Sequence, residues 1–193
     1  YMPTLTVDDG APVVYYASAE DPHPAGGTTL YRYSNGSTEA VEENLNYLLG
    51  ILASDGEVSY IMDENGNTAD ATDINVYTYT DGETTAFDKA GEAVAYGNGF
   101  YGTLDGEEIL FVSDMTNIYY EQNGERKAVL TDERALSGNF TMLTFGGEPV
   151  ILWTENNETL GNGIYYTAYR NGAWTAPVQL GSEERSLAGV LFV

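Results

Sequence analysis

The chain of 193 residues carries 30 acidic and 7 basic side chains, which gives a formal net charge of −23. Nucleic acids and anionic membrane surfaces are bound through clustered lysine and arginine, so neither is an expected partner. Cysteine is absent, which excludes disulfides, thiolate zinc sites and a cysteine nucleophile. Hydrophobic residues make up 42% of the chain, which is enough for a core, and no apolar run is long enough to span a bilayer.

Two turn motifs recur along the chain at intervals of 41 to 50 residues. The first is an Asp-Gly or Gly-Gly pair that ends at Gly10, Gly56, Gly106 and Gly147. The second is an Asn-Gly or Asp-Gly pair that ends at Gly36, Gly82, Gly124 and Gly172. Such pairs between alternating runs predict β-hairpins, because both central residues must take positive φ. The sequence therefore predicts four repeats, each with two hairpins.

Each repeat is expected to hold four strands, which we call A to D in chain order. Strand A is a short apolar run, as at 5–7 and 142–145, and strand B follows the first turn, as at 13–17 and 150–154. A variable loop leads to strand C at 30–33, 76–79, 118–120 and 164–169. Strand D follows the second turn, as at 128–130 and 174–178. No stretch has a sustained helical period, so the fold class is all-β.

Four-stranded antiparallel units of this length are typical of a β-propeller. We expect one propeller region over 1–193, with four-stranded blades at about 1–47, 48–96, 97–136 and 137–186. The segment 187–193 matches 48–54 and is predicted to be the A strand of a further blade. The chain is therefore expected to be a fragment of a larger propeller, and a closed four-bladed ring is the alternative.

The fourth repeat also resembles a known family. Its runs Pro-Val-Ile-Leu-Trp-Thr-Glu at 149–155 and Ile-Tyr-Tyr-Thr-Ala-Tyr-Arg-Asn-Gly-Ala-Trp at 164–174 are similar to sialidase-type propeller blades of bacterial secreted and cell-surface proteins. The resemblance implies a propeller fold and an extracellular or cell-surface location in a bacterium. The turn at 170–174 has the Gly and Trp of the sialidase Asp-box, and it lacks the Ser and Asp of that motif.

The loops between strands B and C and the crossings from D to A share one end of a propeller, where ligands usually bind. The B–C loop that begins at Asp63 offers oxygen ligands from Asp63, Asn65, Asn67 and Asp70, the donor type that calcium prefers. Calcium is therefore a candidate ligand, favoured by the net charge. The alternative is an Asn-Gly turn in a solvated acidic loop. No other cofactor is indicated.

Aromatic side chains provide the second candidate site. Sugars stack on aromatic faces, and the rings that could form such a platform are Tyr15, Tyr16, Tyr60, Trp153 and Trp174. The alternative is packing between blades, which large rings at repeat positions such as Trp153 favour.

We find no convergent catalytic set in the sequence, and the five arginines show no cluster of the kind that sialidases use. The leading hypothesis is a non-catalytic binding or scaffold module for a glycan or a protein. The alternative is part of a sialidase-like glycoside hydrolase whose catalytic residues are completed outside this chain. A third hypothesis is a purely structural spacer without any ligand. Open blade edges also allow self-association.

Overall fold

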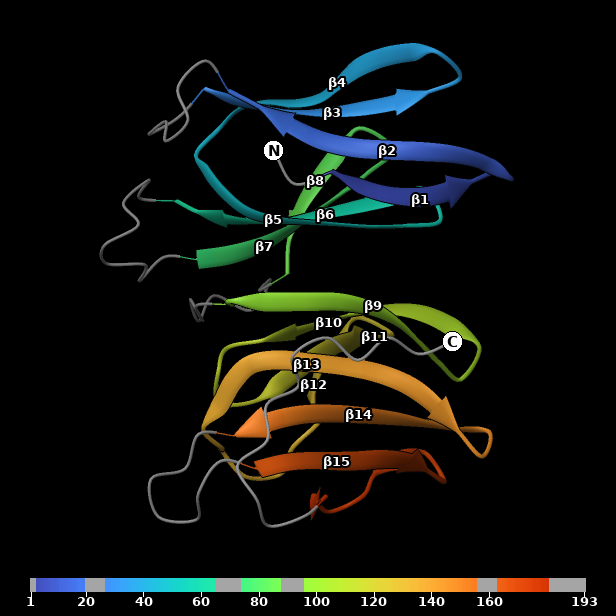
Figure 1. Cartoon of the computed structure of the whole chain (residues 1–193), viewed down its shortest axis with the longest axis vertical. Helices are drawn as coiled ribbons and strands as arrows, with labels where there is room; N and C mark the ends of the chain where they lie inside the picture. The colour runs from blue at the N-terminus through green and yellow to red at the C-terminus, as the bar shows by residue number, and fades with distance from the viewer. Residues whose placement is uncertain (1–2, 20–26, 65–73, 88–95, 156–162, 181–193) are drawn as a thin grey trace. The chain divides into compact units, whose positions relative to one another are not determined.

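The computed structural model describes residues 3–19, 27–64, 74–87, 96–155 and 163–180, with the side chains of 137–139 left aside. The chain divides into two compact units, Tyr1–Gly97 and Asn98–Val193, and each contains two antiparallel sheets (Figure 1). We call them unit 1 and unit 2. No helix occurs in the described ranges, so none of them contains a helical membrane span.

Unit 1 consists of two four-stranded sheets, each a simple meander in which every strand pairs with its neighbour in sequence. The first sheet contains β1 (Thr4–Asp8), β2 (Ala11–Ser18), β3 (Thr28–Ser34) and β4 (Ser37–Leu45). The second contains β5 (Tyr47–Ser54), β6 (Glu57–Asp63), β7 (Ile74–Thr80) and β8 (Glu83–Ala86).

Unit 2 repeats this plan. Its first sheet contains β9 (Asn98–Leu104), β10 (Glu107–Ser113), β11 (Ile118–Gln122) and β12 (Glu125–Ala128). Its second sheet contains β13 (Leu136–Phe145), β14 (Glu148–Glu155), β15 (Gly163–Arg170), β16 (Ala173–Trp174) and β17 (Val178–Gln179).

The outer strands of unit 2 differ in position from the sequence expectation. The strand expected at 128–130 is β12, which begins at Glu125 directly after the turn. The strand expected at 174–178 consists of two short pieces, β16 and β17, and both pair with β15. Pro177 lies between the pieces, and a proline has no N–H to continue a ladder of hydrogen bonds. The predicted A strand at 187–193 lies outside the described residues.

All eight predicted turns have the backbone that their sequences require. In each pair the two central residues have positive φ, from 31° at Asp55 to 87° at Gly82. This is the geometry of hairpin turns whose twist matches that of the flanking strands. The turns fix the register, as in the pairing of Asp8 with Ala11 across the first one.

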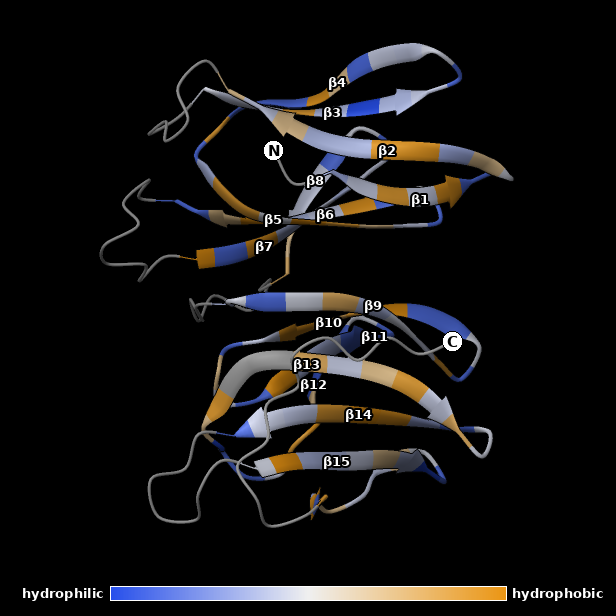
Figure 2. Cartoon of the chain, in the orientation of Figure 1, coloured by the Kyte–Doolittle hydropathy of each residue, from blue (hydrophilic) through white to orange (hydrophobic). Residues whose placement is uncertain are grey.

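Each unit has a core between its own two sheets. In unit 1 the core includes Val13, Leu30 and Ile51, and in unit 2 it includes Phe111, Ile151 and Trp153. Alternate residues of a strand face opposite sides of its sheet, and burial alternates in this way along β1, whereas β6 and β14 have buried residues on both faces. Figure 2 shows the hydrophobic stretch of β14 in orange, next to the polar end of the strand at its blue arrowhead.

Candidate functional site

Three of the five aromatic rings proposed from the sequence lie in the cores. The side chains of Tyr15, Tyr60 and Trp153 are 3%, 1% and 0% exposed. Tyr16 and Trp174 are half-buried. Tyr16 stacks on Tyr31 of the neighbouring strand with ring centroids 5.4 Å apart. Because a sugar stacks only on an accessible ring face, Tyr16 and Trp174 are the two of the five with exposed surface.

Trp174 joins the two sheets of unit 2. Its ring makes edge contacts with Phe111 and Tyr120, at centroid distances of 6.2 and 6.5 Å. Of the five proposed rings, Tyr15, Tyr16 and Tyr60 belong to unit 1, and Trp153 and Trp174 belong to unit 2.

Of the four proposed calcium ligands, only Asp63 falls within the described residues. It is the last residue of β6, and its side chain is buried. Asn65, Asn67 and Asp70 lie outside the described residues. Within the part of the chain that the structure describes, no three His, Cys, Asp or Glu side chains are grouped as a metal site requires.

The loop between β10 and β11 is the one B–C connection that is described throughout. The Asp114 carboxylate organises it by accepting hydrogen bonds from the backbone N–H groups of Thr116 (2.8 Å) and Asn117 (2.7 Å). Such an Asx turn replaces backbone hydrogen bonds that a tight loop lacks. Met115, at its tip, has a φ of 71° and is 41% exposed. A left-handed backbone conformation is energetically costly for a side chain of this size.

The crossing from β12 to β13 is bonded to this loop. The N–H of Arg134 donates to the Thr116 carbonyl (2.8 Å), and that of Leu136 donates to the Met115 carbonyl (2.9 Å). The buried Asn117 side chain adds two further bonds, from its amide N–H to the Leu130 carbonyl (2.9 Å) and from the Leu130 N–H to its oxygen (3.0 Å). Loop and crossing therefore form one hydrogen-bonded rim.

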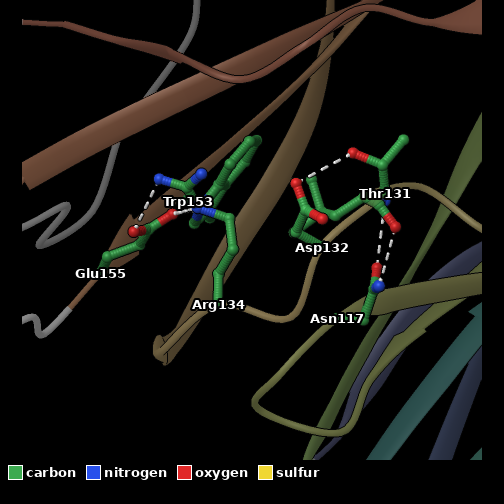
Figure 3. Close-up of polar contacts among 7 residues, drawn as sticks. Asn117, Thr131, Asp132, Arg134, Trp153 and Glu155 are labelled. Carbon is green, nitrogen blue, oxygen red and sulfur yellow. Dashed lines mark hydrogen bonds and ion pairs between the residues drawn. The ribbon is translucent and has the colours of Figure 1, made fainter.

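Arg134 extends from this rim to a buried carboxylate at the end of β14 (Figure 3). Its guanidinium donates to both oxygens of Glu155, from Nε to Oε1 and from Nη2 to Oε2, the latter at 3.0 Å. The Trp153 indole N–H donates to Glu155 Oε1 at 2.7 Å. The Glu155 side chain is 2% exposed and the Arg134 side chain 24%.

The electrostatics of this cluster follow from its geometry. The hydrogen bond to Glu155 raises the pKa of Arg134, because the carboxylate favours the charged guanidinium. The guanidinium carbon lies 4.8 Å from the centre of the Tyr165 ring, which stacks in turn on Trp153. A bidentate pair between two planar groups, supported by a ring, fixes the orientation of the guanidinium.

A hollow of about 640 Å³ opens beside the cluster. It is lined by Met115, Thr116, Glu133, Arg134, Ala135, Leu136 and Glu155. The hollow thus combines guanidinium donors, the exposed carboxylate of Glu133 and the apolar surface of Met115. A neutral ligand with both hydrogen-bonding and apolar groups matches this lining.

No local sequence pattern indicates that Arg134 and Glu155 meet. They are 21 residues apart, and neither belongs to a repeated motif. The hairpin register was the available signal, because β13 pairs with β14 and places Leu136 opposite Glu155. An irregularity between Leu136 and Phe140 shifts that register, so a count from the turn would have missed the partner.

Unit 1 holds a carboxylate of a different kind. Glu42, on β4, accepts hydrogen bonds at Oε2 from the hydroxyl groups of Tyr60 (2.8 Å) and Thr84 (2.8 Å) on the other sheet. Burial and the bond to Glu42 raise the pKa of Tyr60. This carboxylate joins the two sheets through neutral donors.

The comparisons with known proteins concern the fold. No family model matches the chain, and its sequence matches no curated protein. Its structure is similar to the β-propeller domain of the Trilobed protease from Pyrococcus furiosus, with a TM-score of 0.60 at 14% identity over 95% of this chain and 56% of that one. It is also similar to an acylaminoacyl peptidase from Pyrococcus horikoshii, with a TM-score of 0.58 at 14% identity over 94% of this chain and 27% of the other.

The chain thus spans about half of one of these proteins and about a quarter of the other. With its four successive antiparallel sheets, the likeness shows an all-β fold that corresponds to part of a β-propeller.

Proposed function

We propose that this chain is a non-catalytic part of a β-propeller that binds a glycan or a protein at the end formed by its B–C loops and D–A crossings. The observation that carries the proposal is the hollow beside the β10–β11 loop, with its hydrogen-bonded rim and mixed polar and apolar lining. A rigid, partly apolar hollow with a few oriented polar groups is the usual form of a binding site.

The state of Glu155 favours binding over hydrolysis. Glycoside hydrolases use two carboxyl groups, one of which donates a proton to the leaving oxygen. Glu155 is the buried carboxylate of the hollow, and it accepts hydrogen bonds from a guanidinium and an indole. It therefore acts as an acceptor that orients Arg134. The enzymatic alternative, part of a sialidase-like hydrolase, needs a catalytic set completed outside this chain.

The setting that we propose follows from composition and from the resemblance to sialidase-type blades. We place the protein outside a bacterial cell or on its surface, with calcium as a candidate ligand of the Asp63 loop. We expect neither nucleic-acid binding nor membrane insertion, because the charge of −23 opposes the first and the apolar runs are too short for the second. Self-association through open blade edges remains part of the proposal.

A glycan array combined with product analysis tests the proposal. The fluorescently labelled chain is applied to immobilised glycans with and without calcium, and the glycans that retain it are then incubated with the chain and examined for cleavage. We expect retention without products. Release of sugar by the purified chain would overturn the non-catalytic assignment. If no glycan retains the chain, the glycan branch of the proposal fails. The protein branch, in which the ligand is a protein, is then left.

A further inference from the structure

We infer that the hollow of unit 2 is a subsite for an uncharged sugar, that Arg134 binds its hydroxyl groups, and that Glu155 acts as the positioning residue for Arg134. This inference rests on the glycan branch of the proposed function and names the site and the ligand class. It is carried by the Arg134–Glu155–Trp153 cluster and by the lining of the hollow.

The ion pair of Arg134 and Glu155 carries a desolvation cost. Glu155 is 2% exposed, and a buried carboxylate loses most of its hydration. An ion pair in such a place often stabilises a protein no better than an apolar pair of the same size would. The gain from this pair is instead one of orientation, because two hydrogen bonds and the Tyr165 ring hold a planar group in a single position.

Arg134 has more N–H donors than Glu155 uses. A guanidinium has five N–H groups, and two of them donate to Glu155. Figure 3 shows the other terminal nitrogen of Arg134 on the side away from Glu155. Arg134 lines the hollow, so a ligand there meets a donor group that is already oriented. Two neighbouring hydroxyl oxygens of a sugar can accept from one guanidinium edge.

The charges around Arg134 favour an uncharged ligand over an anionic one. The charge of Arg134 is balanced by Glu155, and the two residues before it in the crossing, Asp132 and Glu133, are exposed acids. A carboxylate ligand would therefore add a negative charge to a negative surface on a chain of net charge −23. The hydroxyl of an uncharged sugar can instead donate to Glu133 while its neighbours accept from Arg134.

The rim of the hollow also offers apolar contact and an ordered backbone. A sugar also presents C–H groups, and Met115 offers them an exposed, polarisable side chain at the rim. The left-handed backbone of Met115 is held by the bond that its carbonyl accepts from Leu136 and by the Asx turn at Asp114. A rim that is ordered before binding reduces the entropy that the ligand must overcome.

Methyl NMR tests the inference directly, because the chain has only four methionines. The protein is labelled with ¹³C at the methionine methyl groups, and the Met115 signal is assigned by its loss in Met115→Leu. The probes are the methyl glycosides of galactose, glucose, mannose, fucose and N-acetylglucosamine, each raised to about 50 mM, a range suited to millimolar affinities. Methyl glucuronide and the methyl glycoside of sialic acid are the anionic comparators.

We expect at least one uncharged glycoside to shift the Met115 signal saturably, and both anionic sugars to leave it in place. Arg134→Lys keeps the charge and loses the planar fork, so it should weaken binding about tenfold. Arg126→Lys is the matched control, since Arg126 also lies over a ring, that of Tyr119, and does not line the hollow. Glu133→Ala changes the exposed rim without touching the ion pair and should weaken binding about threefold.

Three outcomes would overturn the inference. They are the absence of a saturable shift with every uncharged glycoside, a saturable shift with an anionic sugar alone, and unchanged affinity in both Arg134→Lys and Glu133→Ala. Retention on the glycan array together with an unshifted Met115 methyl signal would overturn this subsite and leave the proposed function in place. No retention and no shift would overturn both the subsite and the glycan branch.

Discussion

Unit 1 and unit 2 share a fold and differ in how they use a carboxylate. In unit 1, Glu42 accepts from two hydroxyl groups and so connects two sheets. In unit 2, Glu155 accepts from the charged Arg134 and from Trp153, and Arg134 lines a hollow. A hydroxyl that donates to a carboxylate has used its only proton, whereas a guanidinium keeps further donors. The same pair of antiparallel sheets therefore holds a structural contact in unit 1 and a candidate binding group in unit 2.

The largest expected effect comes from removing the carboxylate of unit 2. Glu155→Ala leaves Arg134 without its counter-charge and the buried Trp153 N–H without its acceptor, so we expect a loss of about 3 kcal/mol in the free energy of unfolding. Urea unfolding followed by tryptophan fluorescence reports on unit 2, because both tryptophans, Trp153 and Trp174, lie there. Unit 1 contains no tryptophan, so Glu42→Ala, the matched variant, is followed by far-UV circular dichroism and should cost about 1 kcal/mol. Equal losses of unfolding free energy in Glu155→Ala and Glu42→Ala would contradict the difference that we draw between the two carboxylates.

The second effect concerns how closely the sheets of unit 2 approach. A Cβ on Gly102 would lie 2.6 Å from Met142 Sδ on the other sheet and 3.1 Å from Phe100 Cε2. Gly102→Ala should therefore cost about 2 kcal/mol through overpacking, measured by the same urea unfolding. Met142→Ala in the same chain should restore part of that loss. Additive losses in the double variant would mean that the two groups do not compete for space.

The third effect is a pH dependence in unit 1. The pKa of Tyr60 is raised by burial and by Glu42, so the folded state holds this proton more tightly than the unfolded chain, whose tyrosine pKa is about 10. The contribution is complete below that pH and declines as the pH rises above it. Tyr60→Phe should cost about 1 kcal/mol at neutral pH and should show a shallower decline between pH 9 and 11. Parallel thermal unfolding curves for both proteins across that range would contradict the assignment.

The smallest effect belongs to the ion pairs of Arg32. Its guanidinium donates to Asp8 (2.8 Å) and Glu39 (3.0 Å), and all three side chains are at least a quarter exposed. Exposed pairs contribute little, so Arg32→Gln should lower stability by less than about 1 kcal/mol. Raising the salt concentration should narrow that difference in thermal unfolding. A loss that is large and independent of salt would show that Arg32 acts through packing instead.

The hairpin turns and their strands could be predicted from the sequence because the signals for them are local. An Asn-Gly or Asp-Gly pair sets its own backbone, so the turn at Asn35 could be placed without knowledge of any distant residue. The same holds for the strands beside it. The break in the last strand also had a local cause in Pro177.

The candidate site depended on information that no local pattern holds. Tyr15 and Tyr16 are adjacent and equally aromatic, yet they face opposite sides of β2, and only the packing of the second sheet determines that Tyr15 is buried. The meeting of Arg134 and Glu155 depends on the irregular register between Leu136 and Phe140. Such an irregularity arises from tertiary packing and has no reliable sequence signature.

A crystal structure of the chain soaked with the uncharged glycoside that shifts the Met115 signal most strongly would show whether the hollow binds a sugar. We expect sugar density in the hollow, with hydroxyl oxygens within hydrogen-bonding distance of Arg134 and C–H groups against Met115. Density on the half-buried rings of Tyr16 or Trp174, with the hollow empty, would contradict the inference.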